Sequence, residues 1–94
     1  MKKKRTGLSP FALEVYLTVA SIPYGQVRTY KWVAAKMGKE LACRAVGTAL
    51  KNNPWPMLIP CHRVVKSGGD AGEYVYGREM KKFLIEFERK TAKI

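Results

Sequence analysis

The first apolar run of the chain has clear signals at both of its ends. Ser9 followed by Pro10 is typical of a helix start, with serine as the cap and proline in the first helical position. Leu8 can also pack against Leu13 across this start. The segment SIPYGQ then breaks the pattern. We therefore predict a helix from Ser9 or Pro10 to about Ala20.

Two shorter helices are predicted next, joined by a glycine turn. Thr29 can cap the helix YKWVAAKM, which Gly38 ends. The segment ELACRAVGTALKNN is then predicted to be a second helix, stopped by Asn53 and Pro54. Two short helices with a tight turn between them indicate a helix-turn-helix.

The second half of the chain predicts a loop, a strand and a final helix. The segment NNPWPMLIP holds three prolines and cannot be a regular helix, whereas HRVVKSGGD is typical of a short strand that ends in a turn. From Arg78 the pattern is helical, and Glu88 falls beside an apolar stripe that we expect to face the core. The stripe comprises Met80, Phe83, Leu84 and Phe87. The predicted fold class is mainly α: a small helical domain with a helix-turn-helix of winged-helix type and at most a short strand pair.

The length of 94 residues suits one domain with one modest core. We expect residues 9–94 to form it and residues 1–8 to form a basic tail, either disordered or held by a phosphate contact. The charged start resembles a signal peptide, but Pro10 and Glu14 interrupt it and no cleavage site follows. No apolar run approaches the roughly 20 residues that span a bilayer. We expect an intracellular protein, cytoplasmic in a prokaryote or nuclear in a eukaryote, with no membrane partner.

The charge of the chain predicts a polyanionic partner. Eighteen Lys and Arg against seven Asp and Glu give a net charge of +11, and Glu40 is the only acid between Val15 and Gly69. Within this basic part, Arg44 is surrounded by small residues. These are Ala42, Cys43, Ala45 and Gly47. Small residues can simply allow close helix packing in a core, but next to one arginine in a basic region they indicate a helix that enters a nucleic-acid groove.

The run IPCHRVV places a thiol beside an imidazole and a guanidinium. Cys61 could be a small buried apolar residue, but His62 and Arg63 are expected to lower the pKa of its thiol and make it a nucleophile. A disulfide with Cys43 is less favoured than two reduced thiols. Two cysteines and one histidine do not complete a structural zinc site, so no metal is expected.

The chain resembles a known family at several motifs. NPWPMLIPCHRVV, GEYVYG and REMKKFLIEFE, together with YGQVRTY and CRAVGTALKNNP at matching separations, closely resemble the C-terminal domain of the O6-alkylguanine-DNA alkyltransferases. The resemblance covers about residues 9–88 and lacks the N-terminal domain of many members. It implies DNA repair by irreversible transfer of an alkyl group from O6 of a flipped-out guanine to Cys61, once per molecule, without a cofactor and as a monomer on double-stranded DNA.

The resemblance also implies a role for individual residues at the reacting centre. His62 would relay charge from Cys61 through water, Glu88 would orient the imidazole, and Asn53 would brace the turn before the cysteine. Tyr30 would turn the phosphate and donate a proton to the guanine leaving group.

On the DNA side, Arg44 would insert into the base stack from the minor groove. The full set of expected DNA contacts is Thr29, Tyr30, Ala42, Cys43, Arg44, Ala45, Gly47 and Lys51.

The expected base pocket departs from the family pattern. It would be formed by Tyr74, Val75, Tyr76 and Gly77, where the family usually has Ser or Ala and then Gly-Gly after the tyrosine. A ring at Tyr76 predicts a tight pocket that disfavours bulky alkyl groups, unless this side chain points to solvent. Two other functions stay open: a damage sensor similar to the alkyltransferase-like proteins, which lack the reactive cysteine, and a helix-turn-helix regulator with an inert Cys61.

Overall fold

The computed structural model describes residues 9–55, 58–68, 71–72, 74 and 76–93. Within them it has four α-helices, two short 3-10 turns and one pair of two-residue strands, so the predicted fold class is confirmed. None of the described helices is both long enough and apolar enough to cross a membrane. The predicted basic tail lies outside the described residues.

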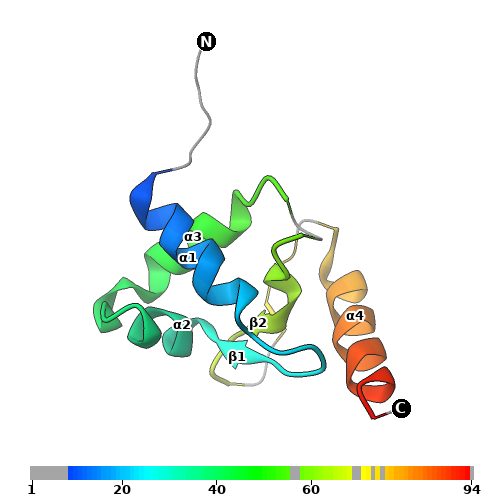
Figure 1. Ribbon diagram of the computed structural model, residues 1–94. Coiled ribbons are helices and arrows are strands. Elements are labelled where there is room, and N and C mark those ends of the chain that lie inside the picture. Colours follow the sequence, from blue (N-terminus) through cyan, green and yellow to red (C-terminus); the bar gives the residue numbers. More distant parts are fainter. Residues whose placement is uncertain (1–8, 56–57, 69–70, 73, 75, 94) are drawn as a thin grey trace.

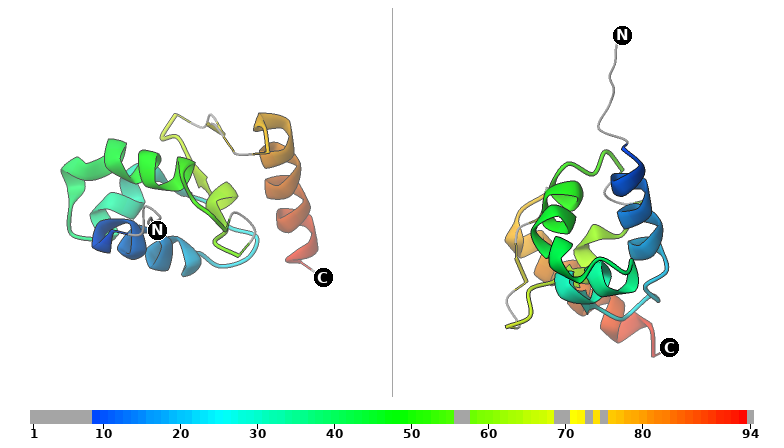
Figure 2. Two further views of the ribbon diagram at one scale, coloured as in Figure 1. Left: turned by 90° about the horizontal axis from the view of Figure 1, so that it is seen from above. Right: turned by 90° about the vertical axis from the view of Figure 1, so that its left-hand side faces the viewer.

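Three helices gather on one side of the molecule and the fourth lies apart from them (Figure 1). The three are α1 (Pro10–Ala20), α2 (Tyr30–Lys36) and α3 (Cys43–Lys51), and the fourth is α4 (Arg78–Thr91). Between the two groups lie the 3-10 turn η2 (Cys61–Arg63) and strand β2 (Val64–Val65), as the views in Figure 2 also show. The segment around Cys61 is therefore in contact with both parts of the protein.

Helix α1 begins with the predicted serine cap. The Ser9 hydroxyl accepts a hydrogen bond from the Ala12 backbone N–H at 3.1 Å, which satisfies one of the unpaired donors of the first turn. The Tyr16 hydroxyl donates to the carbonyl of Ala49 at 2.8 Å and so ties α1 to α3. Leu8, the predicted partner of Leu13 in a packing contact, lies outside the described residues.

Helix α2 also has the predicted ends. The Thr29 hydroxyl accepts from the backbone N–H of Trp32 at 2.9 Å, and the helix stops before Gly38. Gly38 has a φ of +74°, a left-handed conformation that glycine adopts without steric cost. This turn leads into the second helix of the predicted pair.

The start of that second helix differs from the prediction. Residues Glu40–Ala42 form a 3-10 turn, η1, and the α-helix α3 begins only at Cys43. Neither Lys39, before the turn, nor Ala42, before the helix, supplies a capping side chain. Without such a cap the first turn tightens, which is a common way to satisfy helix ends.

The apolar core lies between α1, α2 and α3 and extends to the segment that carries the cysteine. Its buried members are Ala12, Val15, Tyr16, Val19, Ile22, Val33, Ala34, Met37, Val46, Leu50, Cys61 and Val64. Cys61 and Val64 belong to this core, so the three-helix unit fixes the position of the thiol.

The strand predicted for HRVVKSGGD is shorter than expected. Cys61–Arg63 form the 3-10 turn η2, in which the Arg63 N–H donates to the carbonyl of Pro60 at 2.9 Å. Among the described residues of this segment only Val64–Val65 form a strand, β2, which pairs in parallel with β1 (Arg28–Thr29). Because His62 lies in a turn, its direction does not follow the alternation of a strand.

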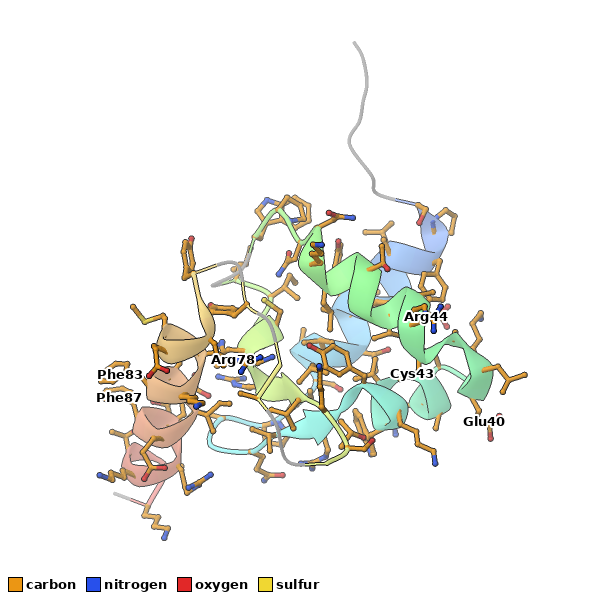
Figure 3. The ribbon with its side chains drawn as sticks, turned by 180° about the vertical axis from the view of Figure 1, so that it is seen from behind. Glu40, Cys43, Arg44, Arg78, Phe83 and Phe87 are labelled. Atoms are coloured by element: carbon orange, nitrogen blue, oxygen red, sulfur yellow. The ribbon has the colours of Figure 1, made fainter. Side chains whose placement is uncertain are left out.

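Helix α4 begins at Arg78 as predicted, but its apolar stripe faces the opposite way. Met80, Phe83 and Phe87 of the predicted inward stripe are 45%, 61% and 49% exposed. Figure 3 shows Phe83 and Phe87 on the side of α4 that points away from the rest of the protein, where their rings stack at 5.9 Å. Leu84 alone of the stripe is partly buried.

The inward face of α4 instead carries two charged residues, Lys81 and Glu88, both buried. They occupy this face because each has polar partners there, which the apolar pattern of the sequence does not report. The end of α4 is held by a hydrogen bond of 2.7 Å between the Tyr24 and Thr91 hydroxyls. Gly25 packs so closely there that a Cβ atom on it would lie 2.5 Å from Cβ of Ala92.

Candidate active site around Cys61

Cys61 is buried at the start of η2, and Asn53 holds the segment that leads to it. The Asn53 amide donates to the carbonyl of Ile59 at 3.2 Å, and its oxygen accepts from the backbone N–H of Trp55 at 2.9 Å. One buried side chain thus binds the chain on both sides of the loop between α3 and Cys61. Expected bracing by Asn53 corresponds to these two contacts.

His62 and Arg63, which follow the cysteine, both bind Glu88 of α4. The His62 Nε2 and Glu88 Oε2 atoms lie 2.7 Å apart, and Arg63 Nε donates to Glu88 Oε1 at 2.8 Å. Arg63 also donates to the carbonyl of Ile22 at 3.0 Å and lies over the ring of Tyr24. Glu88 therefore joins α4 to η2, and Arg63 joins both to the segment after α1.

The environment of Glu88 favours its charged form. Burial alone would raise the pKa of this carboxyl, but hydrogen bonds from Arg63 and His62 outweigh burial and the pKa is lowered. The contact to the carboxylate uses Nε2 of His62. The other ring nitrogen, Nδ1, is buried and has no hydrogen-bond partner among the described residues. The imidazole thus keeps one nitrogen for a further polar group.

The thiol of Cys61 does not have the lowered pKa that its neighbours in the sequence suggested. Burial raises the pKa of Cys61, while a hydrogen bond from Asn53 and the charge of Lys81 act against burial. The prediction was wrong because the core desolvates the sulfur, and because the charge of Arg63 is paired with Glu88. The thiolate therefore needs help from groups other than Arg63.

Cys61 also lines a pocket of about 530 Å³, a volume typical of small-molecule sites. The other lining residues are Tyr30, Arg44, Gly47, Thr48, Leu50, Lys51, Lys66 and Tyr74. Two aromatic rings and three cationic side chains thus line the same pocket as the thiol. Such a pocket suits a flat, polar ring that is attached to negatively charged groups.

The expected DNA-contacting residues fall into two groups. Four of them line the pocket, and these are Tyr30, Arg44, Gly47 and Lys51. Cys43 and Ala45 are exposed on α3, Ala42 is partly buried, and Thr29 caps α2. Figure 3 shows Cys43 and Arg44 near the start of α3, away from α4.

The pocket wall after residue 73 differs from the expectation. Tyr74 lines the pocket, whereas Tyr76 is 55% exposed and lies edge-on against Tyr74 at 5.6 Å. Gly77 is exposed, and Val75 lies outside the described residues. Tyr76 is not among the described residues that line the pocket, which favours the alternative that its side chain points to solvent, and the narrowing of the pocket by its ring stays a prediction.

One residue of the site, Lys81, was not singled out from the sequence, and another, Arg63, was expected in a different role. Lys81 is fully buried beside Tyr30, and Arg63 clamps Glu88. Lys81, Ile85 and Glu88 follow helical spacing as well as the apolar stripe does, one position further along the chain. Two charged residues in register on one helix face, next to a nucleophile motif, were the available signal.

Both cysteines are free, Cys43 exposed and Cys61 buried, so the preference for reduced thiols is confirmed. In the described parts of the chain, no three His, Cys, Asp or Glu side chains gather as metal ligands. Cys61 offers a buried thiol, and the next residue, His62, contacts the Glu88 carboxylate.

A family model described as the DNA binding domain of 6-O-methylguanine DNA methyltransferase matches residues 10–90. The chain belongs to this family. One methyltransferase relative, the methylated-DNA–protein-cysteine methyltransferase of Methanosarcina barkeri, is 45% identical over 78 residues. This alignment covers 83% of the chain and 49% of the relative. The chain spans about half the length of the curated methyltransferases it matches.

Two solved protein–DNA complexes share the fold. Mycobacterium tuberculosis OGT in complex with DNA is similar with a TM-score of 0.85 and 36% identity, over 87% of this chain and 51% of that one. S. pombe Atl1, in complex with damaged DNA containing O6-carboxymethylguanine, has a TM-score of 0.75 and 32% identity. That match covers 90% of this chain and 79% of Atl1.

Proposed function

We propose that this chain repairs DNA by moving an alkyl group from O6 of guanine to the Sγ atom of its own Cys61. The observation that carries the proposal is the position of Cys61. It lines a pocket with Tyr30 and Arg44, and the next residue, His62, is held by Glu88. Membership of the methyltransferase family supports the same reaction.

Double-stranded DNA is the proposed partner, bound by α3 and the pocket rim. Arg44, Lys51 and Lys66 bring three positive charges to the pocket opening, and the whole chain carries +11. Arg44 is exposed among small residues, so its helix can approach a minor groove and its side chain can replace a guanine that leaves the stack. The protein acts as a monomer, in the cytoplasm if it is prokaryotic and in the nucleus if it is eukaryotic.

The transfer is a displacement at the alkyl carbon. The thiolate of Cys61 attacks this carbon, the new S–C bond forms as the C–O6 bond breaks, and the electron pair of that bond stays on guanine. Guanine then takes up one proton. The product on the protein is a thioether without an easy hydrolytic exit, so each molecule acts once and no cofactor is used.

Two side chains, His62 and Tyr30, carry the protons. The thiol proton passes to Nδ1 of His62 through a water molecule, and Glu88 stabilises the resulting imidazolium through Nε2. The Tyr30 hydroxyl donates the proton that guanine needs and regains one from solvent, while the His62 imidazolium releases the thiol proton to solvent. Over the whole reaction, one thiol and one alkylguanine become one thioether and one guanine.

The test is the intact mass of the protein after incubation with a duplex that contains O6-methylguanine. Wild type is expected to gain one methyl group, and Cys61→Ser to gain nothing while it still binds DNA, since the thiol supplies chemistry rather than backbone contacts. An unchanged mass of the wild type with DNA binding intact would contradict transfer and indicate a damage sensor. Strong preference among undamaged sequences would instead indicate a regulator.

DNA affinity supplies a second check on the partner. Contacts to phosphates release counterions, so the affinity is expected to fall steeply as salt rises and to depend little on undamaged sequence. A flat salt response would contradict a phosphate-driven interface.

A further inference from the structure

Lys81 has the largest fully buried side chain in the described part of the chain. Burial of an ammonium group in a protein interior is unfavourable unless polar groups surround it. The proposed roles of Cys61, His62, Glu88 and Tyr30 do not use this charge. The position of this charge beside Tyr30 indicates a role in the chemistry of the site.

The ammonium of Lys81 lies against Tyr30. Its Nζ is 3.5 Å from the Tyr30 hydroxyl oxygen and 5.6 Å from the ring centroid. Gly72 packs over this pair, because a Cβ atom on it would lie 3.3 Å from the hydroxyl and 3.6 Å from Nζ. Gly72 also has a φ of +82°, so both its conformation and its small size suit this contact.

An ammonium can only donate hydrogen bonds, so the Tyr30 oxygen is the acceptor in this contact. The hydrogen of the hydroxyl must then point away from Lys81. Tyr30, which Lys81 contacts, lines the same pocket as Cys61, and the charge of Lys81 lowers the pKa of that thiol against the raising effect of burial. Lys81 and Glu88 stand seven residues apart on one face of α4, so a single helix brings a cation and an anion to the site.

We propose that the buried ammonium of Lys81 directs the Tyr30 hydroxyl hydrogen into the pocket and favours the thiolate form of Cys61. This inference rests on the proposed transfer function. Lys81 is a positioning residue: it acts on the substrate only through Tyr30 and Cys61. It supplies the positive charge that Arg63 was expected to give and does not, since Arg63 is bound to Glu88.

The first experiment measures the thiolate without DNA. Folded wild type, Lys81→Met and Lys81→Arg are treated with iodoacetamide from pH 6 to 10, and the rate at Cys61 is followed on its peptide by mass spectrometry. Lys81→Met is expected to move the midpoint of the rate profile up by about one pH unit, which slows alkylation below both midpoints about tenfold. Lys81→Arg keeps the charge and is expected to shift the midpoint less.

Two controls separate charge at this position from general effects. Lys82→Met removes the neighbouring exposed lysine of α4 and is expected to leave the Cys61 midpoint unchanged. The exposed thiol of Cys43 is an internal control in each protein, and the pH profile of its alkylation rate is expected to be the same in all of them. Equal Cys61 midpoints in wild type and Lys81→Met, or equal shifts at both cysteines, would overturn the thiolate part of the proposal.

The second experiment tests the link to Tyr30. Single-turnover transfer from an O6-methylguanine duplex is measured for Lys81→Met, Tyr30→Phe and the double variant. If Lys81 acts partly through the hydroxyl, the loss caused by Lys81→Met is smaller in the Tyr30→Phe background. Independent, multiplying losses would overturn the orienting role.

Folding of every variant is checked by circular dichroism, and Lys81→Gln replaces Lys81→Met if the latter does not fold. The same outcomes then decide. The proposed function fails separately, if wild type transfers no methyl group. In that case the iodoacetamide profiles still show whether Lys81 favours the thiolate.

Discussion

The three-helix unit of α1, α2 and α3 buries apolar residues, whereas helix α4 buries charged ones. The α1–α3 unit has the expected apolar interior, in which residues such as Val33 and Val46 are completely buried. Helix α4 buries Lys81 and Glu88 and leaves Phe83 exposed. The first unit is held by packing, whereas α4 is held by polar contacts to the segment around Cys61. The polar contacts on the inward face of α4 thus both stabilise the fold and belong to the site around Cys61.

The largest expected effect comes from removing the carboxylate of α4. Glu88→Ala leaves the mostly buried Arg63 without its ion pair, and loss of one partner of a buried pair lowers the free energy of unfolding by about 3–5 kcal/mol. Urea unfolding measures it. The matched control is Glu86→Ala on the same helix, whose exposed ion pair with Arg89 contributes about 0.5 kcal/mol or less. Similar losses in both variants would remove the distinction between the two faces of α4.

Acid should weaken the same contact to a smaller extent, because a protonated carboxyl keeps its volume and can still hydrogen-bond. The pKa of Glu88 is lowered below its ordinary value of 4.5 in the folded protein. Its contribution is therefore complete above pH 4.5 and is lost as the pH falls through the folded-state pKa. Unfolding free energies of wild type and Glu88→Gln are measured from pH 6 to 3. The difference between them is expected to narrow below pH 4.5, and a constant difference would disagree with the lowered pKa.

The two helices should respond differently to loss of apolar side chains. Val46→Ala in α3 removes two buried methyl groups' worth of contact and is expected to cost about 1.5–2 kcal/mol. Phe83→Ala removes a larger side chain that is 61% exposed, so its cost is expected to be about 0.5 kcal/mol. Thermal or urea unfolding compares them. A larger loss for Phe83→Ala would mean that α4 buries its apolar stripe after all.

The smallest expected effect concerns the loop that leads into α4. Tyr76 is exposed, its ring lies edge-on against Tyr74, and it is not among the described residues that line the pocket. Tyr76→Ala is therefore expected to leave the ratio of transfer rates from O6-benzylguanine and O6-methylguanine unchanged within about twofold. The two rates are measured under single-turnover conditions. A clear rise of the benzyl rate relative to the methyl rate would support the tight-pocket hypothesis.

The contrast between the two units also explains what the sequence could predict. Ser9, Thr29 and Gly38 act locally, through caps and a left-handed turn, so the ends of α1 and α2 follow from neighbouring residues alone. The family motif around Cys61 likewise lies in one continuous stretch. Local signals were sufficient for these features.

Partners far apart in the sequence were beyond such signals. The inward face of α4 depends on Lys81 meeting Tyr30 and on Glu88 meeting Arg63, over separations of 51 and 25 residues. The apolar pattern alone placed the aromatic stripe in the core, because contacts between residues far apart in the sequence leave no trace in such a pattern. The pKa of Cys61 was misjudged for the same reason, since burial of the thiol, which raises this pKa, is also produced by core residues distant in the sequence.

The central claim is that Cys61, where the two units meet, accepts the alkyl group. The most direct measurement is peptide mapping by mass spectrometry after the wild type has reacted with an excess of O6-methylguanine duplex. We predict a gain of one methyl group on the peptide that contains Cys61, at no more than one per protein molecule, and none on the peptide of Cys43. An unmodified Cys61 peptide, or a methyl group on Cys43 instead, would contradict the account.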